Sequence, residues 1–140
     1  METPSECGCA ESCEEPLVCL LAGREAQEQR LADFRALFVH LERTVPRPGS
    51  FIWYFRAETA EVEAQVRSIA ANEQACCPFF RFSIHREGAS VLWQVSAPQR
   101  AHEVMAAFML LPETLRSGVD ADALKVALTD AGLRFVEDAQ

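Results

Sequence analysis

The sequence predicts an α+β fold, a small two-layer sandwich in which helices cover one face of a sheet of about three, mostly antiparallel, strands. Short aromatic and β-branched segments with alternating apolar residues indicate strands. Longer segments with apolar residues three and four positions apart indicate amphipathic helices. The two kinds of segment follow each other in the order α-β-α-β-β-α-α. With 140 residues, 49% of them hydrophobic, the chain can form one ordinary core.

Four amphipathic helices are expected from the three-and-four spacing of apolar residues. Prolines help to place their ends: Pro46 stops the first helix, Pro78 stops the second, and Pro98 suits the first turn of the third. A segment before the last helix, residues 110–118, is predicted to be irregular. The expected helices span about residues 25–45, 59–76, 98–109 and 120–131.

Three strands are expected between these helices. The clearest is residues 51–55, where Phe51, Trp53 and Phe55 lie on one face. The other two form a hairpin around a turn at residues 86–89. No internal repeat is evident in the sequence. The expected strands span about residues 51–55, 80–85 and 91–95.

The chain is expected to divide into three parts: a flexible acidic cysteine-rich arm at 1–16, an α+β thiol domain at 17–111, and a C-terminal helical extension at 112–140. The net charge is −8, and five glutamates without a Lys or Arg lie in the first fifteen residues. This balance argues against direct nucleic-acid binding. Without an apolar run of about 18 residues or a secretory signal, we expect no membrane association and a cytoplasmic protein.

All six cysteines lie in two short segments, so thiol chemistry is the first functional hypothesis. The adjacent pair Cys76 and Cys77, followed by Pro78, falls where the second helix is expected to end. That end is the negative end of the helix dipole, which does not activate a thiol as a nucleophile. A soft metal ion, in contrast, displaces the thiol protons itself. The pair therefore favours metal binding over nucleophilic catalysis, with two small buried core residues as the structural alternative.

Glu73 continues the apolar stripe of the second helix, one turn before the two thiols. A buried carboxylate needs a partner, which can be a cation, a metal ion, a backbone donor or a shared proton. The alternatives are that Glu73 turns to solvent or pairs with an arginine such as Arg81. Glu73 is therefore a candidate residue of the thiol site.

Four further cysteines form the array C-x-C-x3-C-x5-C near the N-terminus: Cys7, Cys9, Cys13 and Cys19. They can supply four thiolates for Zn, Cu(I) or an iron–sulfur cluster. Cys19 lies in an apolar run that we expect to dock on the domain, where it can join Cys76 and Cys77. Three sulfurs suit Hg(II), As(III) or Cu(I) better than Mg or Ca. His40, His85 and His102 are scattered, and we expect each to be a surface histidine or one with a hydrogen-bond partner, and not a metal ligand.

These residues resemble a group of small bacterial proteins that carry the motif E-x-x-C-C-x-F-F, alone or as C-terminal modules of MerR-type metal- and thiol-responsive regulators. The resemblance covers about residues 16–110. It implies a role in heavy-metal or thiol stress, with Cys19, Glu73, Cys76 and Cys77 as the positions carried over. A MerR-type DNA-binding region is absent, so DNA binding is not implied. The matching segments are Leu17–Leu20, Glu73–Phe82 and Val95–Pro98.

The expected function is binding of a soft metal or metalloid, Hg, Cu(I), As(III) or Zn, for sensing, buffering or delivery. Its partners would be the ion and a regulator or metal-trafficking protein. One alternative is a thiol enzyme, an oxidoreductase or organometal-cleaving protein, with Cys76 or Cys77 as nucleophile, Glu73 as proton carrier and a pocket beside aromatic residues. A second alternative is an interaction module that forms a homodimer, with incidental cysteines. The aromatic residues expected at the enzyme's pocket are Trp53, Trp93 and Phe79.

Overall fold

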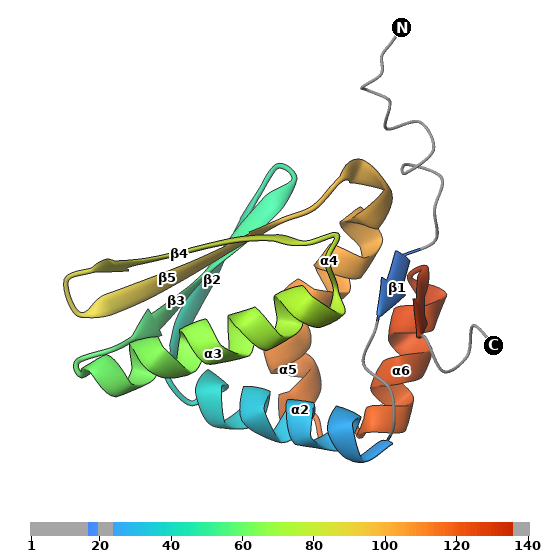
Figure 1. Ribbon diagram of the computed structural model, residues 1–140, viewed down its shortest axis with the longest axis horizontal. Coiled ribbons are helices and arrows are strands. Elements are labelled where there is room, and N and C mark those ends of the chain that lie inside the picture. The colour runs from blue at the N-terminus through green and yellow to red at the C-terminus, as the bar shows by residue number, and fades with distance from the viewer. Residues whose placement is uncertain (1–16, 20–23, 136–140) are drawn as a thin grey trace, which may run out of the picture.

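The computed structural model describes residues 17–19 and 24–135 (Figure 1). Two units, each a helix followed by a hairpin, precede a helical segment, and a short strand stands at each end. In chain order the elements are β1 (Leu17–Cys19), α2 (Arg24–Phe38), β2 (Leu41–Arg47), β3 (Ser50–Arg56), α3 (Ala60–Cys76), β4 (Arg81–Glu87), β5 (Ser90–Ser96), η1 (Gln99–Ala101), α4 (His102–Met109), α5 (Leu111–Arg116), α6 (Ala121–Asp130) and β6 (Leu133–Phe135).

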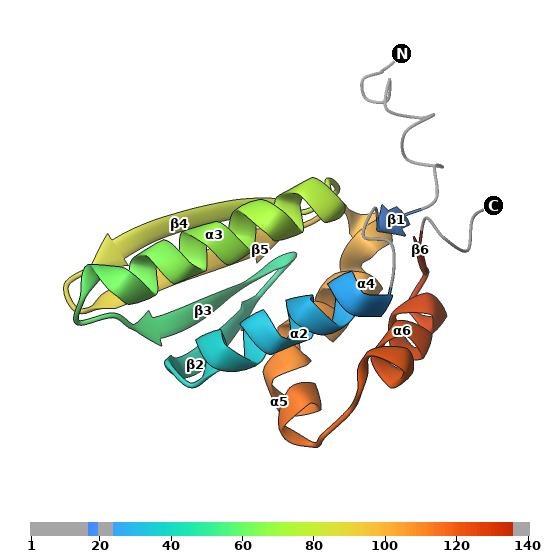
Figure 2. The ribbon, with the colours of Figure 1, turned by 60° about the horizontal axis from the view of Figure 1, so that its bottom comes forward.

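Four strands form one antiparallel sheet in the order β2-β3-β5-β4. The three strands predicted from the sequence correspond to β3, β4 and β5, and β2 adds a fourth. Helices α2 and α3 lie on the same side of the sheet (Figure 2), and Phe34 and Phe38 of α2 contact the rings of its central strands. The predicted α+β sandwich with helices on one face is confirmed.

The first predicted helix is too long. Helix α2 ends at Phe38, and β2 follows it as an edge strand paired with β3. Leu41 lies three residues after Phe38, which suggests a continuing helix. The pairing of β2 with β3 has a register irregularity between Leu41 and Arg43, so this part of the strand departs from the strict alternation of a regular strand. Pro46 is tolerated because β2 is at the edge, and Gly49 takes the left-handed φ of 72° in the turn to β3.

The segment predicted to be irregular before the last helix contains a further helix, α5. Pro112 lies in its first turn, where a missing N–H costs nothing, and a pattern of six residues is too short to indicate a helix by periodicity. The predicted boundary between residues 17–111 and 112–140 falls inside α5. Leu115 of α5 is buried in the same core as Phe34 of α2. The predicted arm, residues 1–16, lies outside the described residues.

A two-stranded parallel sheet, β1 with β6, joins the two ends of the described chain. Leu17 is opposite Leu133, and Cys19 is opposite Phe135. The sequence predicts docking of this apolar run on the domain, but it does not predict a strand. Leu133 is buried in the main core, so this pair of strands is attached to the domain. Within the described part of the chain, no helix combines the length and the apolar character that crossing a membrane requires.

The two helix–hairpin units are related to each other. Both have the order helix, edge strand, central strand: α2–β2–β3 and α3–β4–β5. The central strands share a pattern, Ser50-Phe-Ile-Trp53 and Ser90-Val-Leu-Trp93. Trp53 and Trp93, equivalent in the two units, are also direct partners across the sheet. The structure thus contains an α-β-β repeat that the sequence does not reveal outside these two strands.

Aromatic rings fill the space between the sheet and the helices. The rings of Trp53 and Trp93 meet edge to face with centroids 5.2 Å apart. Phe34 of α2 and Phe108 of α4 both contact Trp93, with centroid distances of 6.3 and 6.1 Å. Among the described residues, these two indole Nε1–H groups are the buried side-chain polar groups without a hydrogen-bond partner. This packed layer provides the base on which α2 and α3 are held.

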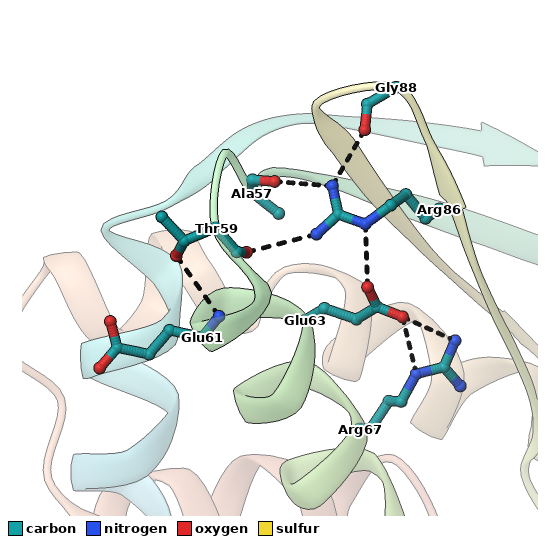
Figure 3. A network of polar contacts seen from close by, with 7 residues as sticks. All are labelled: Ala57, Thr59, Glu61, Glu63, Arg67, Arg86 and Gly88. Atoms are coloured by element: carbon teal, nitrogen blue, oxygen red, sulfur yellow. Dashed lines mark hydrogen bonds and ion pairs between the residues drawn. The ribbon is translucent and has the colours of Figure 1, made fainter.

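Arg86 ties the start of α3 to the β4–β5 hairpin (Figure 3). Its Nε donates to Glu63 at 2.9 Å, and Nη1 donates to the carbonyls of Ala57 and Gly88 at 2.8 and 2.9 Å. Nη2 donates to the Thr59 carbonyl at 3.3 Å. One guanidinium therefore bonds to the segment before α3, to α3 itself and to the β4–β5 turn, which fixes the direction of α3 and with it the position of its other end.

Candidate functional site

The two cysteines lie at the carboxyl end of α3. Cys76 is the last residue of the helix and Cys77 is its C-cap, at φ −127° and ψ 74°. Pro78 cannot continue a helix and disfavours helical geometry at the residue before it, so the chain leaves the helix here. The backbone N–H of Cys77 still donates to the Glu73 carbonyl at 2.8 Å. The dithiol is therefore held against the last turn of α3.

Glu73 is the buried charged side chain of the described core. Arg30 reaches it from α2, with Nη1 2.5 Å from Oε1, and the two side chains are 13% and 8% exposed. Of the alternatives that the sequence leaves open, Glu73 is therefore buried and partnered. Its partner is Arg30 and not Arg81, which is exposed at the start of β4.

Both sulfur atoms contact this ion pair. Arg30 Nη2 donates to Cys76 Sγ at 2.8 Å, and Cys77 Sγ donates to Glu73 Oε2 at 3.5 Å. Cys76 is a half-buried free cysteine, whereas Cys77 is almost fully buried. The four side chains of Arg30, Glu73, Cys76 and Cys77 thus form one connected polar group, which we call the thiol cluster.

Burial raises the pKa of the Glu73 carboxyl above its ordinary value of 4.5. The charge of Arg30 and the hydrogen bonds from Cys77 and Arg30 act in the opposite direction. The net direction of this pKa change is upward because loss of water around the carboxylate is the largest cause. Glu73 can therefore hold a proton beside the Cys77 sulfur more readily than an exposed glutamate does.

A cavity of about 80 Å³ adjoins the thiol cluster. Half-buried Ala107 of α4 is part of the wall. The polar residues of the lining are Arg30, Glu73, Cys77, Gln27 and Lys125. The rest of the wall is mostly apolar and comes from α2, α4, α5, α6 and β6. Its large apolar residues include Leu31, Phe34, Phe108, Leu111, Leu124 and Leu128.

Cys19 is described by its backbone, at the end of β1. In both views β1 lies beside the carboxyl end of α3 (Figures 1 and 2). Leu17, two residues earlier, pairs with Leu133, and Leu133 lines the cavity. The chain thus brings β1 to the same end of the domain as the thiol cluster. The other three cysteines of the N-terminal array lie outside the described residues: Cys7, Cys9 and Cys13.

Other candidate residues from the sequence lie away from the thiol cluster. His85 is exposed on β4, where Nε2 is 3.2 Å from an oxygen of Glu87. Trp53 and Trp93 are fully buried in the aromatic core. Neither tryptophan lines the cavity beside the thiol cluster. The pocket next to the dithiol is therefore bounded by different residues from those that the enzyme hypothesis proposes.

Sequence reasoning missed Arg30. It precedes Phe34 by one helical turn, so it interrupts the apolar stripe of α2 as Glu73 interrupts that of α3. Two opposite charges, each placed on an apolar stripe, indicate a buried ion pair. The sequence contains this cue, but nearness in the chain favours Arg81 as the partner of Glu73, whereas Arg30 lies 43 residues away.

The described side chains do not include a group of three or more His, Cys, Asp or Glu residues arranged to hold a metal ion. Two sulfur donors are present in the thiol cluster, and the Cys19 side chain is not described. Comparison with known proteins finds no match to this chain among protein-family models, curated proteins or solved structures. The resemblance to the E-x-x-C-C-x-F-F proteins stays a prediction.

Proposed function

We propose that this protein binds a soft metal or metalloid ion, Hg(II), As(III), Cu(I) or Zn(II), through the thiolates of Cys76 and Cys77. Cys19 is the proposed third sulfur ligand. The observation that carries the proposal is that two adjacent sulfurs both contact a buried Arg30–Glu73 pair. Sulfur is the preferred donor of these ions.

The charges of the thiol cluster support a divalent ion. With both cysteines as thiols, Arg30 and Glu73 cancel each other's charge. A divalent ion that displaces two thiol protons adds two positive and two negative charges, so the buried site remains neutral. Burial of an uncompensated charge would be costly. A third thiolate would add one negative charge, and protonation of Glu73, whose pKa is raised, would cancel it.

The position of β1 supports Cys19 as the third ligand. β1 lies beside the carboxyl end of α3 (Figures 1 and 2) and is linked through Leu133 to the wall of the adjoining cavity. A third sulfur would complete the trigonal arrangement that Hg(II) and As(III) accept. Cys7, Cys9 and Cys13 would form a separate site in the acidic N-terminal segment, for Zn, Cu(I) or an iron–sulfur cluster.

We propose sensing, buffering or delivery of the ion as the cellular role, in the cytoplasm, with a regulator or a metal-trafficking protein as partner. Nucleic acid is not a proposed partner, since the chain carries a net charge of −8. A homodimer remains a proposal. The aromatic side chains of β3 do not favour it, because Phe51, Trp53 and Phe55 are buried within the protomer.

A thiol-dependent enzyme is the second candidate, favoured by the hydrogen bond from Arg30 to Cys76. A guanidinium next to a half-buried sulfur would neutralise a thiolate nucleophile. Glu73, with a raised pKa, could pass a proton to a leaving group. The two candidates differ in outcome, because a binder forms a lasting stoichiometric complex and an enzyme releases a product repeatedly.

The test is a competition titration of reduced protein with Hg(II) and a chelator, with thiols counted in parallel. Replacement by Ser of Cys19, Cys76 or Cys77 should weaken Hg(II) binding. The loss should exceed the ~10–100-fold that is typical when a residue that only orients a metal ligand is replaced. Deletion of residues 1–15 should lower total capacity and leave the affinity of this site unchanged. The matched control is Cys13→Ser, which should behave as the deletion does.

Two results would decide against the proposal. Unchanged affinity in both Cys76→Ser and Cys77→Ser would place the ion elsewhere. Repeated release of product from an organomercurial or a disulfide, at substoichiometric protein, would favour the enzyme. An equal loss of affinity from the deletion and from Cys76→Ser would mean that the two groups of cysteines form one merged site.

A further inference from the structure

The cavity beside Cys77 is larger and more apolar than an ion requires. Its volume of about 80 Å³ is several times the ~10–15 Å³ that one water molecule needs. Aliphatic and aromatic side chains from several helices line it. Cavities with such a lining take up apolar ligands, and one of ~150 Å³ takes up benzene. An ion bound by the two sulfurs alone would leave this space unused.

We propose that the thiol cluster takes a monosubstituted organic arsenic(III) compound, with arsenic on Cys76 and Cys77 and its aryl group in the cavity. This inference rests on the proposed function and names its ligand class. Cys77 connects the two parts, because it belongs to the cluster and also lines the cavity. Arsenic held at its sulfur therefore lies next to the apolar walls.

Two adjacent sulfurs are sufficient for this class of ligand, without a third. An aryl arsenic(III) centre has one arsenic–carbon bond and two positions that exchange with thiols. The described part of the chain supplies two adjacent thiols, one of them half-buried and accessible at Cys76. Inorganic arsenite has three exchangeable positions and no substituent for the cavity. An organic mercury ion forms linear bonds and gains less from a second adjacent sulfur.

The reaction is a condensation without oxidation or reduction. Phenylarsine oxide, the simplest probe, reacts with two thiols to form two arsenic–sulfur bonds. The arsenic–oxygen bond breaks, and the oxygen leaves as water with both thiol protons. The arsenic stays in the same oxidation state and keeps its phenyl group. The product joins the two cysteines through arsenic, in a larger and less strained ring than a disulfide between adjacent residues would form.

The experiment uses the reduced full chain in which Cys7, Cys9 and Cys13 are replaced by Ser, so that the N-terminal array does not compete. Phenylarsine oxide, methylarsine oxide and arsenite are each titrated against dithiothreitol as competitor. Affinities are expressed relative to dithiothreitol, which cancels the intrinsic strength of arsenic–sulfur bonds. We expect the phenyl probe to be favoured over the methyl probe by about tenfold or more, because its ring is removed from water.

The contribution of the cavity is tested with a matched pair on α4. Ala107→Phe fills the cavity and should abolish the preference for phenyl over methyl while methylarsine oxide binds as before. Ala106→Phe adds the same side chain at the neighbouring exposed position and should keep the preference. The preference for phenylarsine oxide over methylarsine oxide is also measured on the chain with Ala107 in place. That measurement tests the inference even if Ala107→Phe does not fold.

The outcomes separate this inference from the proposed function. Equal relative affinity for the phenyl and methyl probes would overturn the cavity assignment, while binding itself would still support soft-ion binding. A phenyl preference retained in folded Ala107→Phe would place the ring elsewhere and overturn it too. Failure of all three arsenicals and of Hg(II) to bind would overturn both.

Discussion

Arg30 and Glu73, 43 residues apart in the chain, form an ion pair between α2 and α3 that also contacts both adjacent thiols. Both charged side chains are largely removed from water. Removal of one partner from such a pair leaves the other charge uncompensated, which is more destabilising than replacing both. Each partner is therefore expected to depend on the other for its place in the fold.

The first prediction concerns that ion pair. Arg30→Met should lower the free energy of unfolding by ~3–5 kcal/mol, because Glu73 would remain buried without its cation. The double variant Arg30→Met with Glu73→Leu should recover part of the loss. Arg67→Met is the control, since Arg67 pairs with Glu63 at the surface, and it should change stability little. Equal effects of Arg30→Met and Arg67→Met in urea unfolding would show that the buried pair has no special role.

The second prediction concerns pH. The folded-state pKa of Glu73 is raised above 4.5, so between that pH and the raised pKa the folded state binds more protons than the unfolded state. The stability that comes from this group is present below 4.5 and decreases as pH rises through the folded pKa. Wild type should therefore lose stability with rising pH relative to Glu73→Gln. Parallel curves of unfolding free energy against pH would contradict the raised pKa.

The third prediction concerns Glu63 and has the opposite sign. Hydrogen bonds from Arg86 and then Arg67 lower the pKa of the Glu63 carboxyl below 4.5. The corresponding stability is present above 4.5 and decreases as pH falls through the folded pKa. Because this carboxyl is at the surface, added salt should reduce the effect. Glu63→Gln should show a smaller acid loss than wild type in low-salt thermal melts. The same loss of thermal stability at low pH in Glu63→Gln and in wild type would contradict the prediction.

The fourth prediction concerns the Arg86 network in Figure 3. The guanidinium of Arg86 donates to three backbone carbonyls and to Glu63. The single ammonium group of a lysine cannot reproduce this planar set of donors. Arg86→Lys should therefore destabilise the protein by ~1–3 kcal/mol, whereas Arg67→Lys, which alters only the surface pair with Glu63, should be nearly neutral. Hydrogen exchange should show the loss first at the start of α3. A uniform change across all elements would argue against a local role.

The sequence predicts the central elements because their patterns are local. Phe51, Trp53 and Phe55 alternate as a strand requires, and the stripe of α3 continues to Glu73. The sequence does not predict strand β2, because Leu41 fits both a helix and an irregular strand and only pairing with β3 decides between them. Strands β1 and β6, three residues each, form by pairing between distant segments, for which no short pattern exists.

The same distinction holds at the candidate site. Glu73, Cys76 and Cys77 are close in sequence, so helical spacing alone groups them. Arg30 joins them only through the packing of α2 on α3, which depends on the whole aromatic core. The charge balance that favours a divalent ion depends on Arg30, because without it Glu73 would leave the site negative.

The last prediction concerns the redox state of the dithiol. A disulfide between adjacent cysteines would strain the intervening peptide bond, and in the structure Cys76 is a free cysteine. The position of β1 beside the carboxyl end of α3 makes Cys19 the expected oxidation partner (Figure 1). Mild oxidation should join Cys19 to Cys76 or Cys77 and abolish soft-ion binding, and a reductant should restore it. Peptide mapping after oxidation identifies the bridge, and the weaker binding that remains in Cys19→Ser should not decrease further under the same treatment. Bridges confined to Cys7, Cys9 and Cys13, with Cys19 unmodified, would remove Cys19 from the proposed three-sulfur site.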